Sequence, residues 1–197
     1  MNQYFENNNN LKSDVKINKE NINGTEFYFY TDNGVFNKKG LDFGTRLLLE
    51  SIDYSNKSSF LDIGCGCGPI GIYISNLSDG FIVDMVDVND RAIHLCKRYI
   101  KENKKTNLNV FKSDIYENVD SKYDCIITNP PIHAGKTKVY EIINNAKDHL
   151  NNNGELWIVM RKDQGALSMM RDLSDVFTFE VVKKSKGFLI IKAFIWQ

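Results

Sequence analysis

Residues 61–72, LDIGCGCGPIGI, place four glycines between a short apolar run and a segment with helical spacing. The run FLDIG (60–64) is typical of a buried strand and PIGIYISNL (69–77) of a helix, so the glycines form a strand-to-helix turn. Glycine lacks a Cβ, which lets the backbone turn sharply and approach a ligand closely. The start of the helix adds free N–H groups and a partial positive charge, which suit a carboxylate or a phosphate. This stretch predicts a ligand-binding turn in an α/β fold.

Strand and helix patterns alternate after this turn. Strands that alternate with helices form a mostly parallel sheet covered on both faces, so we predict a doubly wound, Rossmann-like fold. The last two strands are joined by a tight turn at Lys186-Gly187, which requires at least one antiparallel strand. The further expected strands are 80–88, 107–114, 123–129, 155–162, 177–185 and 187–197, and the further expected helices are 40–53, 90–104, 136–150 and 165–175.

The segment before the glycine turn predicts a β-hairpin. Residues 1–12 are polar and Asn-rich, whereas residues 15–36 alternate apolar and polar positions on either side of Asn23-Gly24, a pair typical of two-residue hairpin turns. Thr45 is the expected N-cap of the helix that follows. We divide the chain into an N-terminal tail and hairpin extension, residues 1–45, and one folding unit, residues 46–197.

The composition indicates one ordinary globular domain. The chain has 197 residues, of which 42% are hydrophobic and 25% charged, and its formal net charge is zero. Zero net charge argues against a strongly basic, non-specific nucleic-acid binder, and it leaves room for a local basic face. No apolar run is long enough to span a bilayer and the first residues lack a signal-peptide layout, so we expect a cytoplasmic protein with no membrane partner.

The cysteines do not indicate a metal site. No two of them have Cys-x-x-Cys spacing, and a zinc site that also uses His94, His133 or His149 has no ligand spacing in its favour. We therefore expect reduced, structural thiols and no bound metal. The four cysteines are Cys65, Cys67, Cys96 and Cys125.

Two classes of ligand compete for the glycine turn. Residues 66–71 match the dinucleotide pattern G-x-G-x-x-G, and Asp87 lies about twenty residues further on, where a dinucleotide site places its ribose-binding acid. However, Asp62 ends the strand two residues before Gly64, and a carboxylate there repels the pyrophosphate of a dinucleotide. The same carboxylate suits a cationic ligand with an amino group. S-adenosylmethionine is such a ligand, and we predict it as the cofactor.

Acidic residues also end the next two strands. At the end of the second strand, Asp87 can accept hydrogen bonds from both ribose hydroxyls, and Asp84 is a competing candidate that lies in mid-strand. Asp114 ends the third strand and could accept from the adenine amino group. Each of these residues alone could be the N-cap of a helix. Three carboxylates at three successive strand ends favour one shared adenosine ligand.

The stretch TNPPIHAGK (128–136) leaves the fourth strand at the same edge of the sheet. Asn129 offers an amide oxygen, and the two prolines that follow have no N–H, so their stiff backbone only accepts hydrogen bonds. Fixed acceptors suit a planar amino group with two N–H donors. Holding both hydrogens on Asn129 Oδ1 and the Pro130 carbonyl would turn the nitrogen lone pair toward a methyl donor.

These motifs together resemble class I S-adenosylmethionine-dependent methyltransferases. The D-x-G-x-G-x-G turn, the acidic end of the second strand, KSD (112–114) and NPP (129–131) occur in order at normal spacing. More narrowly, GVFNKKGLDFGTRLLLE (34–50) together with NPPIHAGK (129–136) is similar to the small-methyltransferase family. That family includes bacterial small-subunit ribosomal RNA guanine-N2 methyltransferases, and the resemblance covers residues 15–197.

The resemblance implies a seven-stranded sheet in the order 3-2-1-4-5-7-6, with the N-terminal hairpin over the cofactor mouth. It implies methyl transfer to an exocyclic amino nitrogen of a nucleobase, first of all guanine N2, with ribosomal RNA or a ribosomal subunit as the partner. The implied catalytic residues are Asn129, Pro130, Pro131 and Ile132. The expected cofactor-binding residues are Asp62, Gly64, Gly66, Gly68, Asp87, Val88, Asp114, Asn129 and Thr45, with Asp42 as a further candidate.

The sequence departs from the family at one place. Ile132 follows the prolines, where these families often carry a Tyr or Phe that stacks on the flipped base. Phe36 or His133 could supply a ring instead, although Phe36 could equally fill the core under the hairpin. Lys136, Arg161 and Lys162 follow strand ends and could meet phosphates.

Two other functions compete with nucleobase methylation. The amide of a protein glutamine is also a delocalised nitrogen that Asn-Pro-Pro could hold. The second alternative is a non-catalytic binding module that has kept the fold. Such a module would be expected to have lost the glycine turn or Asn129, and both are present. A nicotinamide dehydrogenase is disfavoured by Asp62, Asp114 and the Asn-Pro-Pro turn.

Overall fold

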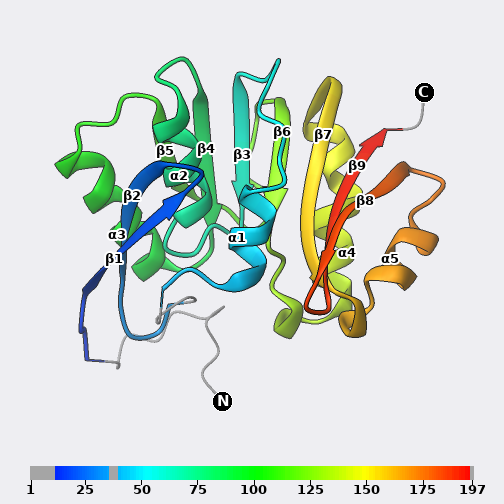
Figure 1. Cartoon of the computed structure of the whole chain (residues 1–197), viewed down its shortest axis with the longest axis horizontal. Coiled ribbons are helices and arrows are strands. Elements are labelled where there is room, and N and C mark those ends of the chain that lie inside the picture. The colour runs from blue at the N-terminus through cyan, green and yellow to red at the C-terminus, as the bar shows by residue number, and fades with distance from the viewer. Residues whose placement is uncertain (1–11, 36–39, 196–197) are drawn as a thin grey trace.

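The computed structural model describes residues 12–35 and 40–195. A central sheet stands between two layers of helices, and a separate two-stranded hairpin lies outside one of the layers (Figure 1). The hairpin consists of β1 (Lys16–Ile22) and β2 (Thr25–Thr31). The sheet contains β3 (Ser59–Ile63), β4 (Ile82–Asp87), β5 (Leu108–Lys112), β6 (Tyr123–Thr128), β7 (Leu150–Arg161), β8 (Phe177–Ser185) and β9 (Phe188–Ile195). The α-helices are α1 (Phe43–Leu49), α2 (Pro69–Leu77), α3 (Asp90–Glu102), α4 (Lys136–Asn145) and α5 (Ala166–Asp172).

The strand order of the sheet is β5-β4-β3-β6-β7-β9-β8, which is the predicted order 3-2-1-4-5-7-6 when strands are counted from β3. The strands from β5 to β7 are parallel, and β9 pairs antiparallel with both β7 and β8. The prediction of a doubly wound, mostly parallel sheet is therefore confirmed. Because parallel strands end at one edge, Gly64, Asp87 and Asn129 all come to the same edge of the sheet.

An apolar core fills each side of the sheet. Side chains alternate along a strand, so Phe60 faces one core and Leu61 the other. The hairpin, α1, α2 and α3 contribute to the first core, and α4 and α5 contribute to the second. The central strands β3 and β6 are mostly buried on both faces, which explains why they read as continuous apolar runs.

The hairpin packs against α2 and α3 (Figure 1). Its turn at Asn23-Gly24 has φ values of 49° and 85°, as the Asn-Gly pair predicts. The Phe27 ring lies 5.4 Å from the ring of Tyr73 in α2, and the Tyr28 ring lies 5.1 Å from that of Tyr99 in α3. The expectation that the hairpin strands lie over the cofactor mouth is wrong, because their aromatic side chains pack on these two helices.

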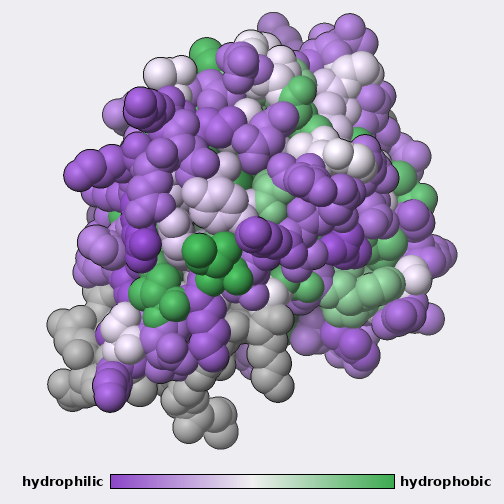
Figure 2. All heavy atoms as spheres, turned by 60° about the vertical axis from the view of Figure 1, so that its left-hand side comes forward, coloured by the Kyte–Doolittle hydropathy of each residue, from purple (hydrophilic) through white to green (hydrophobic). Residues whose placement is uncertain are grey.

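The face of the molecule that carries the hairpin is mostly hydrophilic and has only small, separate hydrophobic areas (Figure 2). Within residues 12–35 and 40–195, no helix is long and apolar enough to cross a membrane.

The predicted boundaries at the start of α1, the end of α4 and the start of β7 are wrong; the helix expected over 136–150 ends at Asn145. The N-cap of α1 is Asp42 rather than Thr45, because the Asp42 carboxylate accepts a hydrogen bond from the Thr45 N–H at 3.0 Å. A carboxylate at this position also interacts well with the helix dipole. The strand expected to begin at residue 155 begins at Leu150, because the residues before it pair irregularly with the start of β6.

Candidate functional site

The glycine turn after β3 is held against the end of β4. The N–H groups of Gly64 and Cys65 both donate to the Val86 carbonyl, at 2.9 and 3.0 Å. Gly64 has a φ of +70°, and a Cβ placed on it would meet no atom within 4 Å among the described residues. The Gly66 N–H donates to Asp87 Oδ2 at 2.8 Å. The turn is therefore a rigid backbone segment with open space beside Gly64, as close approach to a ligand requires.

The two later glycines are required by packing inside the protein. A Cβ on Gly68, which has a φ of +79°, would lie 2.8 Å from Cys96 Sγ in α3. A Cβ on Gly71 would lie 2.5 Å from Met85 Cγ and Sδ in β4. These glycines let α2 lie directly on the sheet and on α3. Cofactor binding by Gly68 stays a prediction.

Asp62 is the buried acid beneath the turn. Its side chain is 1% exposed, and Oδ2 accepts a hydrogen bond from the Gly71 N–H at 3.2 Å. Oδ1 is also buried, and it has no hydrogen-bond partner in the described part of the chain. Burial, with a contribution from Asp87, raises the pKa of Asp62 to about 8. A buried oxygen without a donor is costly, so this atom fits a ligand that brings one, as the amino group of S-adenosylmethionine would.

Asp87 ends β4 beside the turn. One carboxylate oxygen accepts from the Gly66 N–H and the other accepts from the Asn89 N–H, both at 2.8 Å. Burial raises the pKa of Asp87, and these two hydrogen bonds oppose that rise. The Val88 N–H is a third backbone donor, and a carboxylate has about four lone-pair positions, so Asp87 can still accept a hydrogen bond from a ribose hydroxyl. Val88, which follows, is half-buried.

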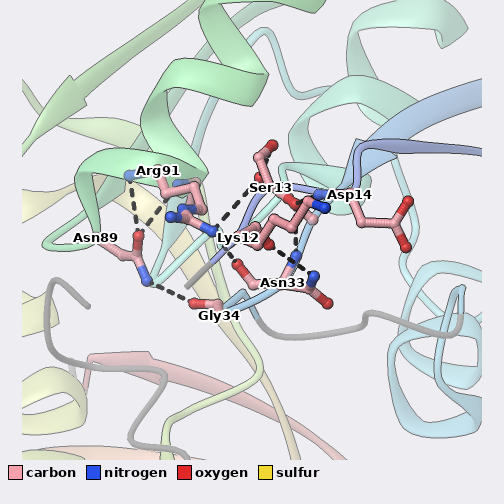
Figure 3. A network of polar contacts seen from close by, with 9 residues as sticks. Lys12, Ser13, Asp14, Asn33, Gly34, Asn89 and Arg91 are labelled. Atoms are coloured by element: carbon pink, nitrogen blue, oxygen red, sulfur yellow. Dashed lines mark hydrogen bonds and ion pairs between the residues drawn. The ribbon is translucent and has the colours of Figure 1, made fainter. Parts of the chain in front are cut away.

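The turn that follows β2 is fastened to the start of α3, directly after Asp87 (Figure 3). Asn89 caps α3, and its Nδ2 donates to the Gly34 carbonyl at 3.2 Å. Arg91 donates to the Asn33 carbonyl at 2.7 Å. Asp32 lies in the same turn. Burial alone would raise its pKa, but hydrogen bonds to its carboxylate, among them those from the Asp14 and Asn33 N–H groups, have the larger effect and lower its pKa. The hairpin thus reaches the cofactor edge through this turn.

Asn129 is tied to the first helix by two successive hydrogen bonds. Its Nδ2 lies 2.9 Å from Thr45 Oγ1, and Thr45 Oγ1 lies 2.6 Å from Asp42 Oδ2. A carboxylate only accepts, so the Thr45 hydroxyl donates to Asp42 and accepts from Asn129. This relay assigns the amide orientation of Asn129. Its Oδ1 receives no hydrogen bond from the described residues and can accept one from a substrate.

The segment after Asn129 becomes exposed only from His133 onward. Pro130 is buried and Pro131 half-buried, and Ile132–Ala134 then form one 3-10 turn. His133 and Lys136 are exposed. Lys136 Nζ lies 4.7 Å from the centre of the Tyr140 ring, whereas His133 contacts no described aromatic ring. The His133 ring is thus not held by stacking on a described side chain, and its role in substrate binding stays a prediction.

A cavity of about 260 Å³ opens beside Ile132, between α4 and the segment that follows β7. Ile132, Val139 and Met160 form its apolar wall, and the Tyr140 ring supplies an aromatic one. The Tyr140 hydroxyl donates to Asp172 at 2.8 Å, which holds that ring in place. Tyr140 was not predicted from the sequence, because its place in this cavity depends on β7 and α5, which are distant in the chain.

The remaining predicted residues lie at the edges of the site or outside it. Asp114 is half-exposed, and its carboxylate forms an ion pair with Lys138 at 2.7 Å, so an adenine contact stays a prediction. Asp84 accepts a hydrogen bond from the Tyr123 hydroxyl at 2.7 Å, which gives it a structural role. Phe36 lies outside the described residues. All four cysteines are buried and none of them forms a disulfide, and the described residues contain no group of three or more metal-ligating side chains.

The strand order and the buried acid beneath a glycine turn are those of the class I S-adenosylmethionine-dependent methyltransferases, and the chain is an enzyme of that class. The family model of the methyltransferase small domain matches residues 26–192, so the chain belongs to that family. S-adenosylmethionine is its methyl donor. The resemblance noted from the sequence is thereby confirmed.

Several known proteins are similar to this chain. The uncharacterized protein YbxB of Bacillus subtilis is 42% identical, over 92% of this chain and 94% of its own length. Ribosomal RNA small subunit methyltransferase C of Haemophilus influenzae is 40% identical over 66% of this chain, and this match spans 40% of that enzyme's length. The Thermus thermophilus 16S rRNA N2 G1207 methyltransferase, solved with AdoMet and guanosine, aligns with a TM-score of 0.78 at 21% identity, over 91% of this chain and 50% of that one.

Proposed function

We propose that this chain methylates an exocyclic amino nitrogen of a nucleobase, and specifically guanine N2 in small-subunit ribosomal RNA. The observation that carries the proposal is the fixed amide of Asn129. Because Thr45 occupies its Nδ2, the substrate meets an amide oxygen at the edge of the sheet where the cofactor residues also lie. An acceptor at that point matches the N–H groups of an amine.

The chemistry at the substrate nitrogen depends on how its hydrogens are held. The lone pair of a guanine amino group is delocalised into the ring, so the nitrogen is a weak nucleophile. Asn129 Oδ1 and the Pro130 carbonyl would accept its two N–H groups and favour a pyramidal nitrogen. Positioning and fixed dipoles of this kind lower the barrier without a strong base. The nitrogen gains the methyl group and releases one proton to water.

The cofactor residues have separate roles in this proposal. S-adenosylmethionine supplies a methyl group on a positively charged sulfur when it is bound. Asp62 Oδ1 is the acceptor for its amino group, Gly64 leaves room for the methionine part, and Asp87 accepts from the ribose hydroxyls. The further proposed cofactor contacts are Gly66, Gly68, Val88, Asp114 and Thr45.

The cavity beside Ile132 is the proposed site of the flipped base. Planar rings bind well between apolar walls and an aromatic side chain, and this cavity has both. Gln164 and Ser168 add polar groups to its lining, which can read the edge of a base. Tyr140 would then provide the ring that Ile132 lacks.

The relatives favour RNA over a protein substrate. The Haemophilus enzyme, whose name refers to ribosomal RNA, is 40% identical over the matched region. A ribosomal protein L11 methylase from Lactobacillus delbrueckii shares the fold with a TM-score of 0.70, at 17% identity. Methylation of a protein glutamine amide is therefore the second candidate, with its support limited to the fold and to the acceptor chemistry of Asn129.

A transfer assay separates these candidates. Tritiated S-adenosylmethionine is incubated with undermethylated small ribosomal subunits, with free small-subunit RNA and with ribosomal proteins, and Asn129→Ala serves as the inactive control. We expect label in RNA, recovered as N2-methylguanosine after digestion to nucleosides. Label in protein, or equal label with Asn129→Ala, would contradict the proposal.

A further inference from the structure

An exposed aromatic side chain lies among cations at the start of α1. We use the name Phe43 patch for Phe43, Phe188, Arg161 and Lys186. The rings of Phe43 and Phe188 are 5.8 Å apart, and Phe43 remains 36% exposed. Lys186 Nζ lies 4.6 Å from the centre of the Phe43 ring, and Arg161 Cζ lies 5.3 Å from that of Phe188. The patch thus combines an accessible ring with two positive charges.

The packing beneath the patch is close. A Cβ on Gly44 would lie 2.8 Å from the Phe188 ring, so the glycine lets α1 rest directly on the first residue of β9. The Lys162 N–H donates to the Gly187 carbonyl at 2.9 Å, which joins the end of β7 to the β8–β9 turn. These contacts hold Phe43 on a fixed base, which reduces the entropy lost when a ligand binds to it.

The surroundings of the patch carry an excess of positive charge. Asp163 pairs with Arg161 at 3.0 Å. Lys192 in β9 pairs with Glu180 at 2.8 Å, whereas the four other lysines of this region form no ion pair within residues 12–35 and 40–195; they are Lys162, Lys183, Lys184 and Lys186. Five cations against two carboxylates, Asp163 and the Asp42 that precedes Phe43, leave a net charge of +3 for this group, on a chain whose formal net charge is zero. The five cations are Arg161, Lys162, Lys183, Lys184 and Lys186.

The patch borders the proposed catalytic residue. Phe43 is two residues before Thr45, whose hydroxyl contacts Asn129. Arg161 ends β7, which is the neighbour of β6, and Asn129 directly follows β6. Figure 1 shows the β8–β9 turn at the same end of the sheet as the end of β7. A polymer that places one residue at Asn129 can therefore extend over this patch.

From these contacts we infer that the Phe43 patch binds the single-stranded RNA that flanks the target nucleotide, an inference that rests on the proposed function. A neighbouring base stacks on the Phe43 ring, and the ammonium of Lys186 moves from that ring to the adjacent phosphate. Arg161 holds a second phosphate. Stacking on an aromatic ring together with cations that follow the backbone is the usual way in which proteins bind single-stranded RNA.

Fluorescence anisotropy with a labelled single-stranded RNA oligonucleotide tests this inference. Phe43→Ala should weaken binding about tenfold, since each stacked base contributes about that much, and Phe43→Tyr should restore it. Lys186→Gln should weaken binding and lower its dependence on salt concentration. The matched controls are Phe194→Ala, which removes a ring that is 38% exposed at the other end of β9, and Lys19→Gln on the hairpin. Both controls should bind RNA like the parent.

The outcomes separate the patch from the proposed function. If the parent methylates RNA and Phe43→Ala binds RNA equally well, the patch inference fails and the function stands. If the parent neither binds nor methylates RNA, both fail. If the patch variants lose methyl transfer to a ribosomal protein instead, the surface docks protein and the inference is overturned. Calorimetric titration with S-adenosylmethionine should give one affinity for all variants, which excludes misfolding as the cause of a loss.

Discussion

The Thr45 hydroxyl lies 2.9 Å from Nδ2 of Asn129 and joins the first helix to the end of β6. This contact fixes which end of the Asn129 amide is presented to a substrate. Thr45→Val keeps the shape of the side chain and removes the hydroxyl. We expect kcat to fall about tenfold, because one hydrogen bond of about 1.4 kcal/mol no longer orients the amide. Thr45→Ser, which keeps the hydroxyl, should retain most of the activity, and a loss of equal size in both variants would contradict this role.

Asn129 itself should be required for methyl transfer. Asn129→Ala removes the proposed acceptor for the amine, and we expect kcat to fall about 100- to 1000-fold, as when a fixed catalytic dipole is lost from other enzymes. The affinity for S-adenosylmethionine, measured by calorimetry, should change little. Single-turnover kinetics with saturating cofactor would check the result, and a normal rate would remove Asn129 from the mechanism.

Asp62 should make the stability of the ligand-free protein depend on pH. Its pKa is about 8 in the folded protein, against an ordinary value of 3.8. Between these values the folded chain retains a proton that the unfolded chain has lost, so the free energy of unfolding decreases as pH rises. The contribution of protonated Asp62 to the free energy of unfolding is complete below about pH 4 and is lost by about pH 8.

Urea unfolding at pH 5 and pH 8 measures this effect. Asp62→Asn carries no titratable group there, so its free energy of unfolding should change less between the two pH values than that of the parent. Asp84→Asn is the control, because it removes a strand carboxylate that is only half-buried. The same pH dependence in parent and Asp62→Asn would show that Asp62 is ionised in the ligand-free protein.

Asp87 should determine cofactor affinity. Asp87→Ala removes the acceptor proposed for the ribose and releases the N–H groups of Gly66 and Asn89. We expect the Kd for S-adenosylmethionine to rise about 10- to 100-fold. Calorimetry checks the change, with NAD as the competing ligand in a second titration. Unchanged affinity would assign Asp87 to the turn alone.

Gly71 should be required for the stability of the fold. In Gly71→Ala the new methyl group would lie 2.5 Å from Met85, so the helix must move from the sheet at a cost of about 1–3 kcal/mol. Gly80→Ala is the matched control, since its Cβ would meet only Ser78 Oγ at 3.5 Å. Thermal unfolding compares the two, and equal melting temperatures would show that the close contact relaxes without cost.

The strand ends could be predicted from the sequence because the signals there are local. The glycine turn, the Asn23-Gly24 turn and the Lys186-Gly187 turn each follow from the conformations that their own residues favour. The order of the strands came from the resemblance to a family. Periodicity alone defined the strands and left their order open.

One error arose from two nearby residues that could each be the same N-cap, and the others arose from contacts between distant segments. Thr45 has the chemistry of an N-cap, but Asp42 is present three residues earlier and its carboxylate is the stronger acceptor. The hairpin was placed over the cofactor mouth because its aromatic residues gave no sign of their partners on α2 and α3. The ring of Tyr140 and the Phe43 patch were missed for the same reason, since both depend on contacts between elements far apart in the sequence.

The position of β9 has a consequence for how the protein is made. β9 is the last strand of the sheet along the chain, yet it lies between β7 and β8, and its first residue supports Phe43. During synthesis the edge of β7 therefore remains unpaired until Phe188–Ile195 has left the ribosome. An open strand edge invites pairing with other chains. Premature termination after Ser185 would thus yield an aggregation-prone chain rather than a weaker enzyme.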